Sequence, residues 1–261
     1  MIGIASPSFC FRPFDEVLEE VSRDFRLWEV LVEGEHQLEV ARSSMVRAMD
    51  SFDMRLQIHA PMSDVNIGSI HEPMRKSATR EIASTIKACN EMDLPLVTIH
   101  PGFIGGIAFL DKSMVLTQTK RSLTELVPIA ADNSVELVLE NMPRGINATC
   151  TTASELIELT SSTGLGVCFD MGHANTAGQI DEFLRHSSMF RNVHLHNNDG
   201  SWDQHNPIDI GTADVGAVVR GIQQGGYRGN YVIESTDLDG GILSRDVLAG
   251  LLEPSPAPDA L

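Results

Sequence analysis

Acidic and imidazole side chains recur in this sequence at the ends of short apolar segments. MRLQIH ends in His59, PLVTIH in His100 and VELVLE in Glu140. A single such residue is usually a hydrogen-bonded core group, but a buried cluster of them would be costly unless a cation compensated its charge. Nitrogen and carboxylate donors without cysteine indicate zinc, manganese, iron or cobalt rather than calcium. The other donors at such ends are Asp170, His194, His196 and Glu234.

Two local pairs lie just beyond these segments. In FDMGHAN, Asp170 and His173 are separated by two residues, close enough to reach neighbouring ions from one turn. In SWDQH, Asp203 and His205 occupy alternate positions, so an extended loop would point both side chains the same way. Together with the segment ends, these pairs predict a metal centre built from several parts of the chain.

The elements that must position these donors alternate along the whole chain. Short apolar runs typical of buried strands are separated by longer segments with helical spacing. Eight strand–helix units predict a closed (β/α)8 barrel, whose strand ends converge on the face where active sites form. The expected strands are 2–5, 28–33, 54–59, 95–100, 135–140, 166–170, 192–196 and 230–234.

Helical spacing and capping residues define the segments between these strands. Thr152 and Thr212 are the expected N-caps of two of the helices. We expect one barrel domain over residues 1–252 and a disordered, proline-rich tail over residues 253–261. The expected helices cover 14–25, 73–90, 113–132, 152–163, 179–188 and 213–226.

Composition narrows the classes of protein. The chain has 261 residues, close to the roughly 250 that one such barrel needs, and 42% are hydrophobic. The sequence contains no run of about 18 apolar residues, so we expect no membrane span. The N-terminus reads as a strand rather than a signal peptide, and four scattered cysteines indicate reduced thiols, so we expect a cytoplasmic protein. The formal net charge of −17 disfavours indiscriminate nucleic-acid binding.

The motifs IHAPM, TIHPG, VLENMP, FDMGHAN, HLHNND, DQH and VIEST, in this order, resemble the xylose isomerase-like TIM-barrel superfamily and, within it, the endonuclease IV branch. The resemblance runs from the third expected strand to the eighth. It implies three zinc ions held by nine side chains. The first ion would be held by His59, His100 and Glu140; the second by Glu140, Asp170, His194 and Glu234; the third by His173, Asp203 and His205.

Some motifs are closer to the sugar isomerases and epimerases of the superfamily. HLHNNDGSWDQH contains no Lys or Arg, whereas the endonuclease branch has a basic segment there. The motifs DMGHA and HLHNN resemble those of the sugar isomerases and epimerases. The loop APMSDVNIGS lacks the aromatic and leucine side chains that would wedge DNA open. The expected substrate is therefore either abasic DNA or a free sugar or phosphorylated small molecule.

Charge arithmetic separates two reactions. Three divalent ions against Glu140, Asp170, Asp203 and Glu234 leave about +2, which suits a metal-activated hydroxide attacking a phosphoester. One ion of zinc, manganese or cobalt, against the three acids of the second group, leaves about −1. Glu140 and Glu234 would then exchange protons beside a sugar carbonyl, as in an isomerase or epimerase. The extra donors favour phosphoester hydrolysis, although in an isomerase His59, His100 and His173 could instead hydrogen-bond sugar hydroxyls. The same donors argue against a third hypothesis, a non-catalytic binding module.

A few other residues have weaker interpretations. Arg144, after NMP, is the best candidate to contact an anionic substrate, although a surface role is the commoner one for arginine. His196 shares a face with His194 and is expected to support the ligands or contact substrate; a shift of register would make it the ligand instead. His36, His71 and His186 are expected in solvent.

Overall fold

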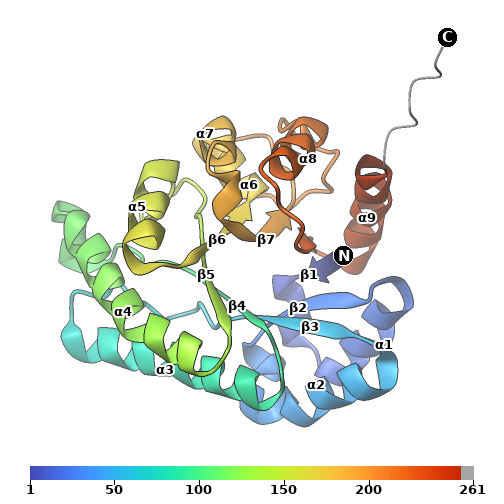
Figure 1. The fold of residues 1–261 in the computed structure, drawn as a ribbon, viewed down its shortest axis with the longest axis horizontal. Coiled ribbons are helices and arrows are strands. Elements are labelled where there is room, and N and C mark those ends of the chain that lie inside the picture. The colour runs from blue at the N-terminus through green and yellow to red at the C-terminus, as the bar shows by residue number, and fades with distance from the viewer. Residues whose placement is uncertain (254–261) are drawn as a thin grey trace.

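A barrel of eight parallel strands forms the centre of the computed structural model, which describes residues 1–253 (Figure 1). Each strand pairs with the next along the chain, and β1 pairs with β8 to close the barrel. The prediction of a (β/α)8 barrel is confirmed, with every strand within a few residues of its expected place. The strands are β1 (Ile2–Ala5), β2 (Leu27–Leu31), β3 (Arg55–His59), β4 (Leu96–Ile99), β5 (Glu136–Glu140), β6 (Gly166–Asp170), β7 (Phe190–Leu195) and β8 (Tyr231–Glu234).

Helices surround the barrel on its outside (Figure 1). In the described residues they are α1 (Phe14–Asp24), α2 (Leu38–Phe52), α3 (Glu72–Glu91), α4 (Ser113–Asp132), α5 (Ala153–Thr163), α6 (Met171–Ala177), α7 (Ile180–Leu184), α8 (Val215–Gln224) and α9 (Leu238–Leu252). Short 3-10 turns cover η1 (Pro7–Phe11), η2 (Gly34–His36), η3 (Gly106–Leu110) and η4 (Ser187–Met189). Helices α2, α6 and α9 are not among those expected from the sequence. In α9, three glycines weaken the helical signal, and α6 follows β6 without a loop.

The alternation of side chains along each strand divides the core in two. On β2, Trp28 and Val30 face outward and join the large apolar cluster between strands and helices. Leu27 faces the barrel interior, where it packs with Ala5 and Val232. Glu29 lies on the same inward side as Leu27, because residues two apart share a face. The barrel interior therefore holds polar as well as apolar side chains.

The two predicted helix caps differ in outcome. Thr152 caps α5 as expected, its hydroxyl accepting a hydrogen bond from the Glu155 amide. Thr212 does not cap α8; that prediction is wrong, and Asp214 accepts from the Ala217 amide instead. The Thr212 hydroxyl is engaged elsewhere, since it accepts from the Asn175 side-chain amide at 2.9 Å.

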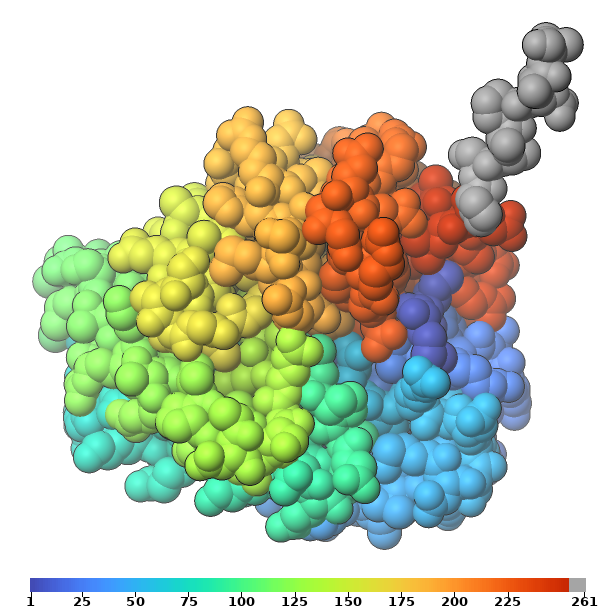
Figure 2. Space-filling view, viewed as in Figure 1, coloured from blue at the N-terminus to red at the C-terminus, as the bar shows by residue number. Residues whose placement is uncertain are grey.

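The ends of the described chain lie close together. Figure 2 shows the C-terminal helix α9 in red beside the dark blue N-terminal segment, and α9 packs against both β1 and β8. Of the predicted disordered tail, only Glu253 falls within the described residues; 254–261 lie outside them. Over residues 1–253, none of the helices combines the length and the apolar character that a membrane crossing requires.

His36 is buried, so the expectation that it lies in solvent is wrong. Only 1% of its surface is exposed, because its ring packs edge-on against Phe14 and Trp28, with ring centroids 5.3 and 5.4 Å away. Its Nε2 atom has no hydrogen-bond partner among the described residues. Burial lowers the pKa of His36 from 6.5 to about 4. The sequence around His36 does not reveal this burial, because Phe14 and Trp28 belong to other elements of the chain.

This burial predicts a pH-dependent loss of stability. The folded protein disfavours protonated His36, so the stabilisation is complete above pH 6.5 and is lost as pH falls from 6.5 to about 4. Across this window the free energy of unfolding of the wild type should fall by on the order of 2–3 kcal/mol because of His36, and His36→Phe should abolish that fall. Urea unfolding of both proteins at pH 7.5 and 4.5 measures it. His71→Phe, at an exposed site, should keep the wild-type dependence of stability on pH. If wild type and His36→Phe lost equal stability between pH 7.5 and 4.5, His36 would not be the cause.

Candidate metal centre

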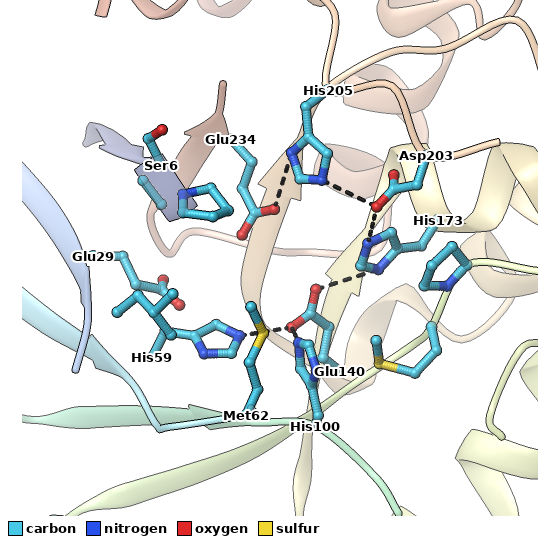
Figure 3. A pocket seen from close by; sticks show the side chains of 15 residues that line it. Ser6, Glu29, His59, Met62, His100, Glu140, His173, Asp203, His205 and Glu234 are labelled. Carbon is cyan, nitrogen blue, oxygen red and sulfur yellow. Dashed lines mark hydrogen bonds and ion pairs between the residues drawn. The ribbon is translucent and has the colours of Figure 1, made fainter. Parts of the chain in front are cut away.

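Seven of the nine predicted ligands line one cavity of about 140 Å³ at the mouth of the barrel, and the other two, Asp170 and His194, are buried without lining it (Figure 3). His59, Glu140, Asp170 and Glu234 are each the last residue of a strand, and His100 follows β4 directly. Parallel strands bring these ends together because they all run the same way through the barrel. Figure 3 shows an unbroken series of contacts around the cavity from His59 to Glu234.

The first donor group joins β3, β4 and β5. The Nε2 atoms of His59 and His100 both lie 3.2 Å from Oε2 of Glu140. Nδ1 of His59 lies 2.9 Å from the Ala60 carbonyl, to which it donates. That hydrogen bond leaves the Nε2 lone pair free to face Glu140, which is the orientation a metal ligand needs.

The second donor group lies at the centre and shares Glu140 with the first. Glu140, Asp170, His194 and Glu234 offer ligand atoms that all lie within 4.8 Å of one another. Nδ1 of His194 is 3.0 Å from Oε1 of Glu234 and 3.3 Å from Oε1 of Glu140. Glu140 thus turns one oxygen to each group, the arrangement of a carboxylate that bridges two ions.

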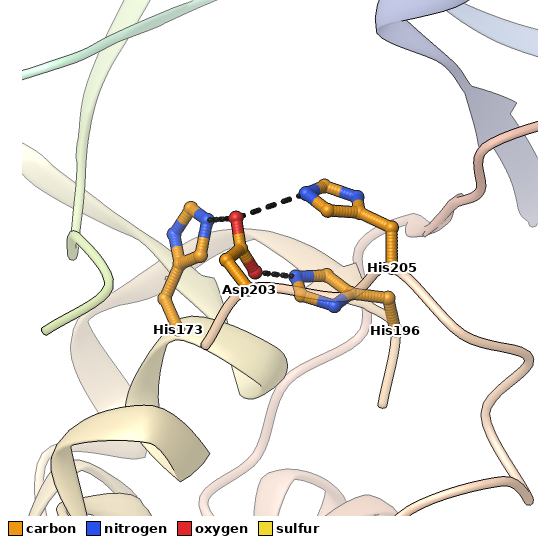
Figure 4. Close-up of side chains that lie close together, drawn as sticks. All are labelled: His173, His196, Asp203 and His205. Carbon is orange, nitrogen blue, oxygen red and sulfur yellow. Dashed lines mark hydrogen bonds and ion pairs between the residues drawn. The ribbon is translucent and has the colours of Figure 1, made fainter. Parts of the chain in front are cut away.

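The third donor group belongs to the loop after β7 and to α6 (Figure 4). Oδ2 of Asp203 lies 3.2 Å from Nε2 of His173 and 3.0 Å from Nε2 of His205. His205 has a φ of 50°, a left-handed conformation that is uncommon for residues other than glycine. An antiparallel bridge between Asn197 and Asn206 pins the loop beside it. The fold therefore holds His205 in place at some backbone cost.

His196 is closer to the donors than the sequence analysis expects. Its Nε2 atom lies 3.2 Å from Oδ1 of Asp170 and 3.4 Å from Oδ1 of Asp203, between the second and third groups. Its ring stacks on His205 with centroids 4.0 Å apart. The ring occupies space that only a glycine leaves free, since a Cβ atom on Gly172 would lie 2.0 Å from it.

Charge dominates the energetics of the centre. Burial alone would lower the pKa of His173, but the carboxylates of Asp170 and Asp203 raise it well above its usual value. Burial alone would raise the pKa of Asp203, but hydrogen bonds from His173 and His205 hold it far below its usual value. The carboxylates of Asp170 and Asp203 are therefore stable together only when protons or metal ions supply positive charge beside them.

Unpartnered buried atoms test whether a metal fits. In residues 1–253, Oδ1 of Asp203, Oδ2 of Asp170, Nδ1 of His205 and both ring nitrogens of His196 have no hydrogen-bond partner. Buried polar atoms without partners are rare and costly. Imidazole and carboxylate donors suit zinc and related ions. The residues present fit divalent metal.

Family membership follows from a match to the model described as xylose isomerase-like TIM barrel, which covers residues 22–250. The chain belongs to this family. It is 31% identical over 260 residues to MJ1311, an uncharacterised protein of Methanocaldococcus jannaschii, covering 96% of this chain and 89% of that protein. It is 24% identical over 140 residues to a probable endonuclease 4 of Aquifex aeolicus, covering 52% and 48%.

Two solved structures are similar to this chain in fold. A protein described as D-tagatose 3-epimerase-like superposes with a TM-score of 0.89 and 30% identity, covering 96% of each chain. A D-psicose 3-epimerase superposes with a TM-score of 0.78 and 16% identity, covering 95% of this chain and 97% of that one. The second likeness is one of fold alone.

Several site features escaped sequence reasoning. Glu29, inside β2, contacts His194 from below, and Cys168 lies within reach of His194 and Glu140. The alternation of β2 could have placed Glu29 inside the barrel, whereas its contact with β7 depends on the barrel's closure. Arg144 has an exposed side chain and does not line the cavity, so its role as a substrate contact stays a prediction.

The contact between Gly172 and His196 predicts a coupled pair of substitutions. Gly172→Ala should destabilise the protein by about 1–3 kcal/mol, because the added methyl group overlaps a buried ring held by stacking. Adding His196→Ala should recover much of that loss by removing the ring. Urea unfolding of the two single variants and the double variant measures the coupling.

Gly250→Ala, on α9, meets no atom within 4 Å and serves as the matched control. It should leave stability unchanged or slightly raised. Additive losses at Gly172 and His196, with no recovery in the double variant, would show that the two positions do not interact as described.

Proposed function

We propose that this protein is a metal-dependent phosphoester hydrolase with a multinuclear centre of up to three ions, zinc being the best match to the donors. The observation that carries the proposal is the division of Glu140, whose two oxygens face different donor groups. The third group adjoins them, since Nδ1 of His173 lies 3.4 Å from Oε1 of Glu140. Adjacent metal sites are typical of enzymes that cleave phosphoesters by in-line displacement.

The donors divide the work among them. When bound, divalent ions here would polarise a phosphoryl group and lower the pKa of a water molecule. Glu140, which the first and second donor groups share, would keep the two groups at a fixed distance from each other. Asp203 and His205 would contribute to the third, outer donor group from a loop that the bridge between Asn197 and Asn206 stabilises. Met62, Met142 and Pro143 line the same cavity and would exclude bulk water from it.

Charge supports several ions rather than one. The centre holds five carboxylates once Glu29 is included: Glu29, Glu140, Asp170 and Glu234 are buried, and Asp203 is partly buried. Three divalent ions would leave about +1, which attracts a phosphoester, whereas one would leave about −3, which repels it. Protonated histidines could offset the difference only by ceasing to act as ligands.

The cavity walls favour a compact substrate. Among residues 1–253, no lysine or arginine lines the cavity, and away from the donors its lining is largely apolar, including Pro7, Leu31, Met62 and Met142. The chain also carries a net charge of −17. A long polyanion such as DNA gains affinity chiefly from basic side chains. We therefore rank a small phosphorylated molecule ahead of abasic-site DNA as substrate.

Epimerisation of a sugar is the second candidate. Glu140 and Glu234 enter the cavity from β5 and β8, and both approach Nδ1 of His194. Two carboxylates flanking one ion could remove and return a proton beside a carbonyl. The similarity to the D-tagatose 3-epimerase-like structure also favours this reaction.

Substitution of His205 separates the two candidates. His205→Ala removes a donor of the outer group, so the hydrolase should lose at least about 100-fold in kcat/KM. A single-ion epimerase uses only the central group and should lose little. The assays are zinc-dependent cleavage of bis(4-nitrophenyl) phosphate, nicking of abasic-site duplex, and interconversion of ketohexoses followed by chromatography.

His71→Ala, at an exposed position, is the matched control and should retain wild-type rates. Cleavage of a phosphoester that depends on His205 supports the hydrolase. Epimerisation by wild type that survives His205→Ala, with no phosphoester cleaved, would replace it by the second candidate.

A further inference from the structure

A layer of polar side chains lies inside the barrel directly beneath the metal centre. Glu29, Gln57, Thr98 and Asn192 come from β2, β3, β4 and β7, and each is at most 2% exposed. Four buried polar side chains at one level of a barrel interior need a reason, because apolar residues would fill the same space at less cost.

Glu29 is the acceptor at the middle of this layer. Its Oε2 atom accepts from the side-chain amides of Gln57 and Asn192, the latter at 2.8 Å. Its Oε1 atom lies 3.0 Å from Nε2 of His194. The carboxylate therefore connects the polar layer to the central donor group, and Nδ2 of Asn192, 3.0 Å from Nε2 of His194, approaches the same ring nitrogen.

The amides around Glu29 are held so that their donors face it. Oε1 of Gln57 accepts from Asn230 at 3.1 Å, and Nε2 of Gln57 also donates to Asn192 at 3.0 Å. The Asn192 amide donates in addition to Thr98 at 3.0 Å. Turning either amide around would break these hydrogen bonds, so the Oε2 position of Glu29 faces donors and must hold an acceptor.

We propose that Glu29 is a positioning residue of the metal centre. By accepting a hydrogen bond from Nε2–H of His194, it keeps the proton on Nε2 and leaves Nδ1 free, directed at Glu140 and Glu234. A carboxylate behind a ligating histidine commonly fixes the tautomer and raises the affinity of the ligand for its ion. This inference rests on the central donor group of the proposed function, and not on the reaction catalysed there.

The effect of Glu29→Gln follows from the same hydrogen bonds. Glutamine has nearly the same shape, but its amide would turn its oxygen towards the two donors from Gln57 and Asn192. Its NH2 group would then donate to Nε2 of His194 and move the histidine proton to Nδ1. The substitution thus reverses the tautomer and blocks the atom that faces the central group.

Metal titration of the full-length protein tests the proposal. Metal-free wild type, Glu29→Gln and Thr98→Val are titrated with Co²⁺ and followed by visible absorption, with affinities set by a competing chelator. We expect the tightest site of Glu29→Gln to weaken by about 10- to 100-fold, with an altered spectrum. Thr98→Val disturbs the same buried layer without touching His194, so it should bind Co²⁺ nearly as wild type does.

The tautomer of His194 provides a second measurement that needs no variant. In the zinc-loaded wild type, ¹⁵N NMR should find Nε2 protonated and Nδ1 bound to metal. Equal Co²⁺ affinity in wild type and Glu29→Gln, a loss equally large in Thr98→Val, or a proton on Nδ1 of His194 would each overturn the proposal. A protein that binds Co²⁺ as expected yet cleaves no phosphoester would refute the proposed function alone.

Discussion

The burial of carboxylates at one end of the barrel is the constraint on which the rest of the site depends. Glu140, Asp170 and Glu234 end neighbouring or facing strands, and Asp203 is brought to them by a loop. Their mutual repulsion would open the barrel mouth unless positive charge lay between them. The histidines can supply that charge when they are protonated. Within residues 1–253, Oδ1 of Asp203 and Oδ2 of Asp170 nevertheless remain buried without a hydrogen-bond partner.

The same requirement explains several features away from the cavity. Gly172 is small because the His196 ring occupies the space beside it, and His205 adopts a left-handed conformation that brings its Nε2 to Asp203. Glu29 adds a further buried charge, which the amides of Gln57 and Asn192 stabilise from below. Backbone, glycine and core residues are thus all adapted to one set of donors.

Much of this could be predicted from the sequence, and the limits have physical reasons. Strands that end in His59, Glu140 or Asp170 are evident locally, because period and chemistry change at the same residue. The contact of Glu29 with His194 depends on closure of the barrel, which joins segments 165 residues apart. His36 was misplaced because its aromatic neighbours come from other elements. Helix α9 was missed because packing against β1 and β8, rather than propensity, stabilises it.

Proteins described as sugar 3-epimerases share this fold, and a probable endonuclease 4 is similar to half of the chain, so the fold alone does not choose the reaction. The choice depends on whether the groups around His100 and His205 hold ions. The most direct measurement is the zinc content of protein saturated with zinc and then freed of loosely bound metal. We expect about three zinc ions per chain, each removed in turn by a stronger chelator. A single tightly bound zinc ion per chain would show that the centre does not hold three ions.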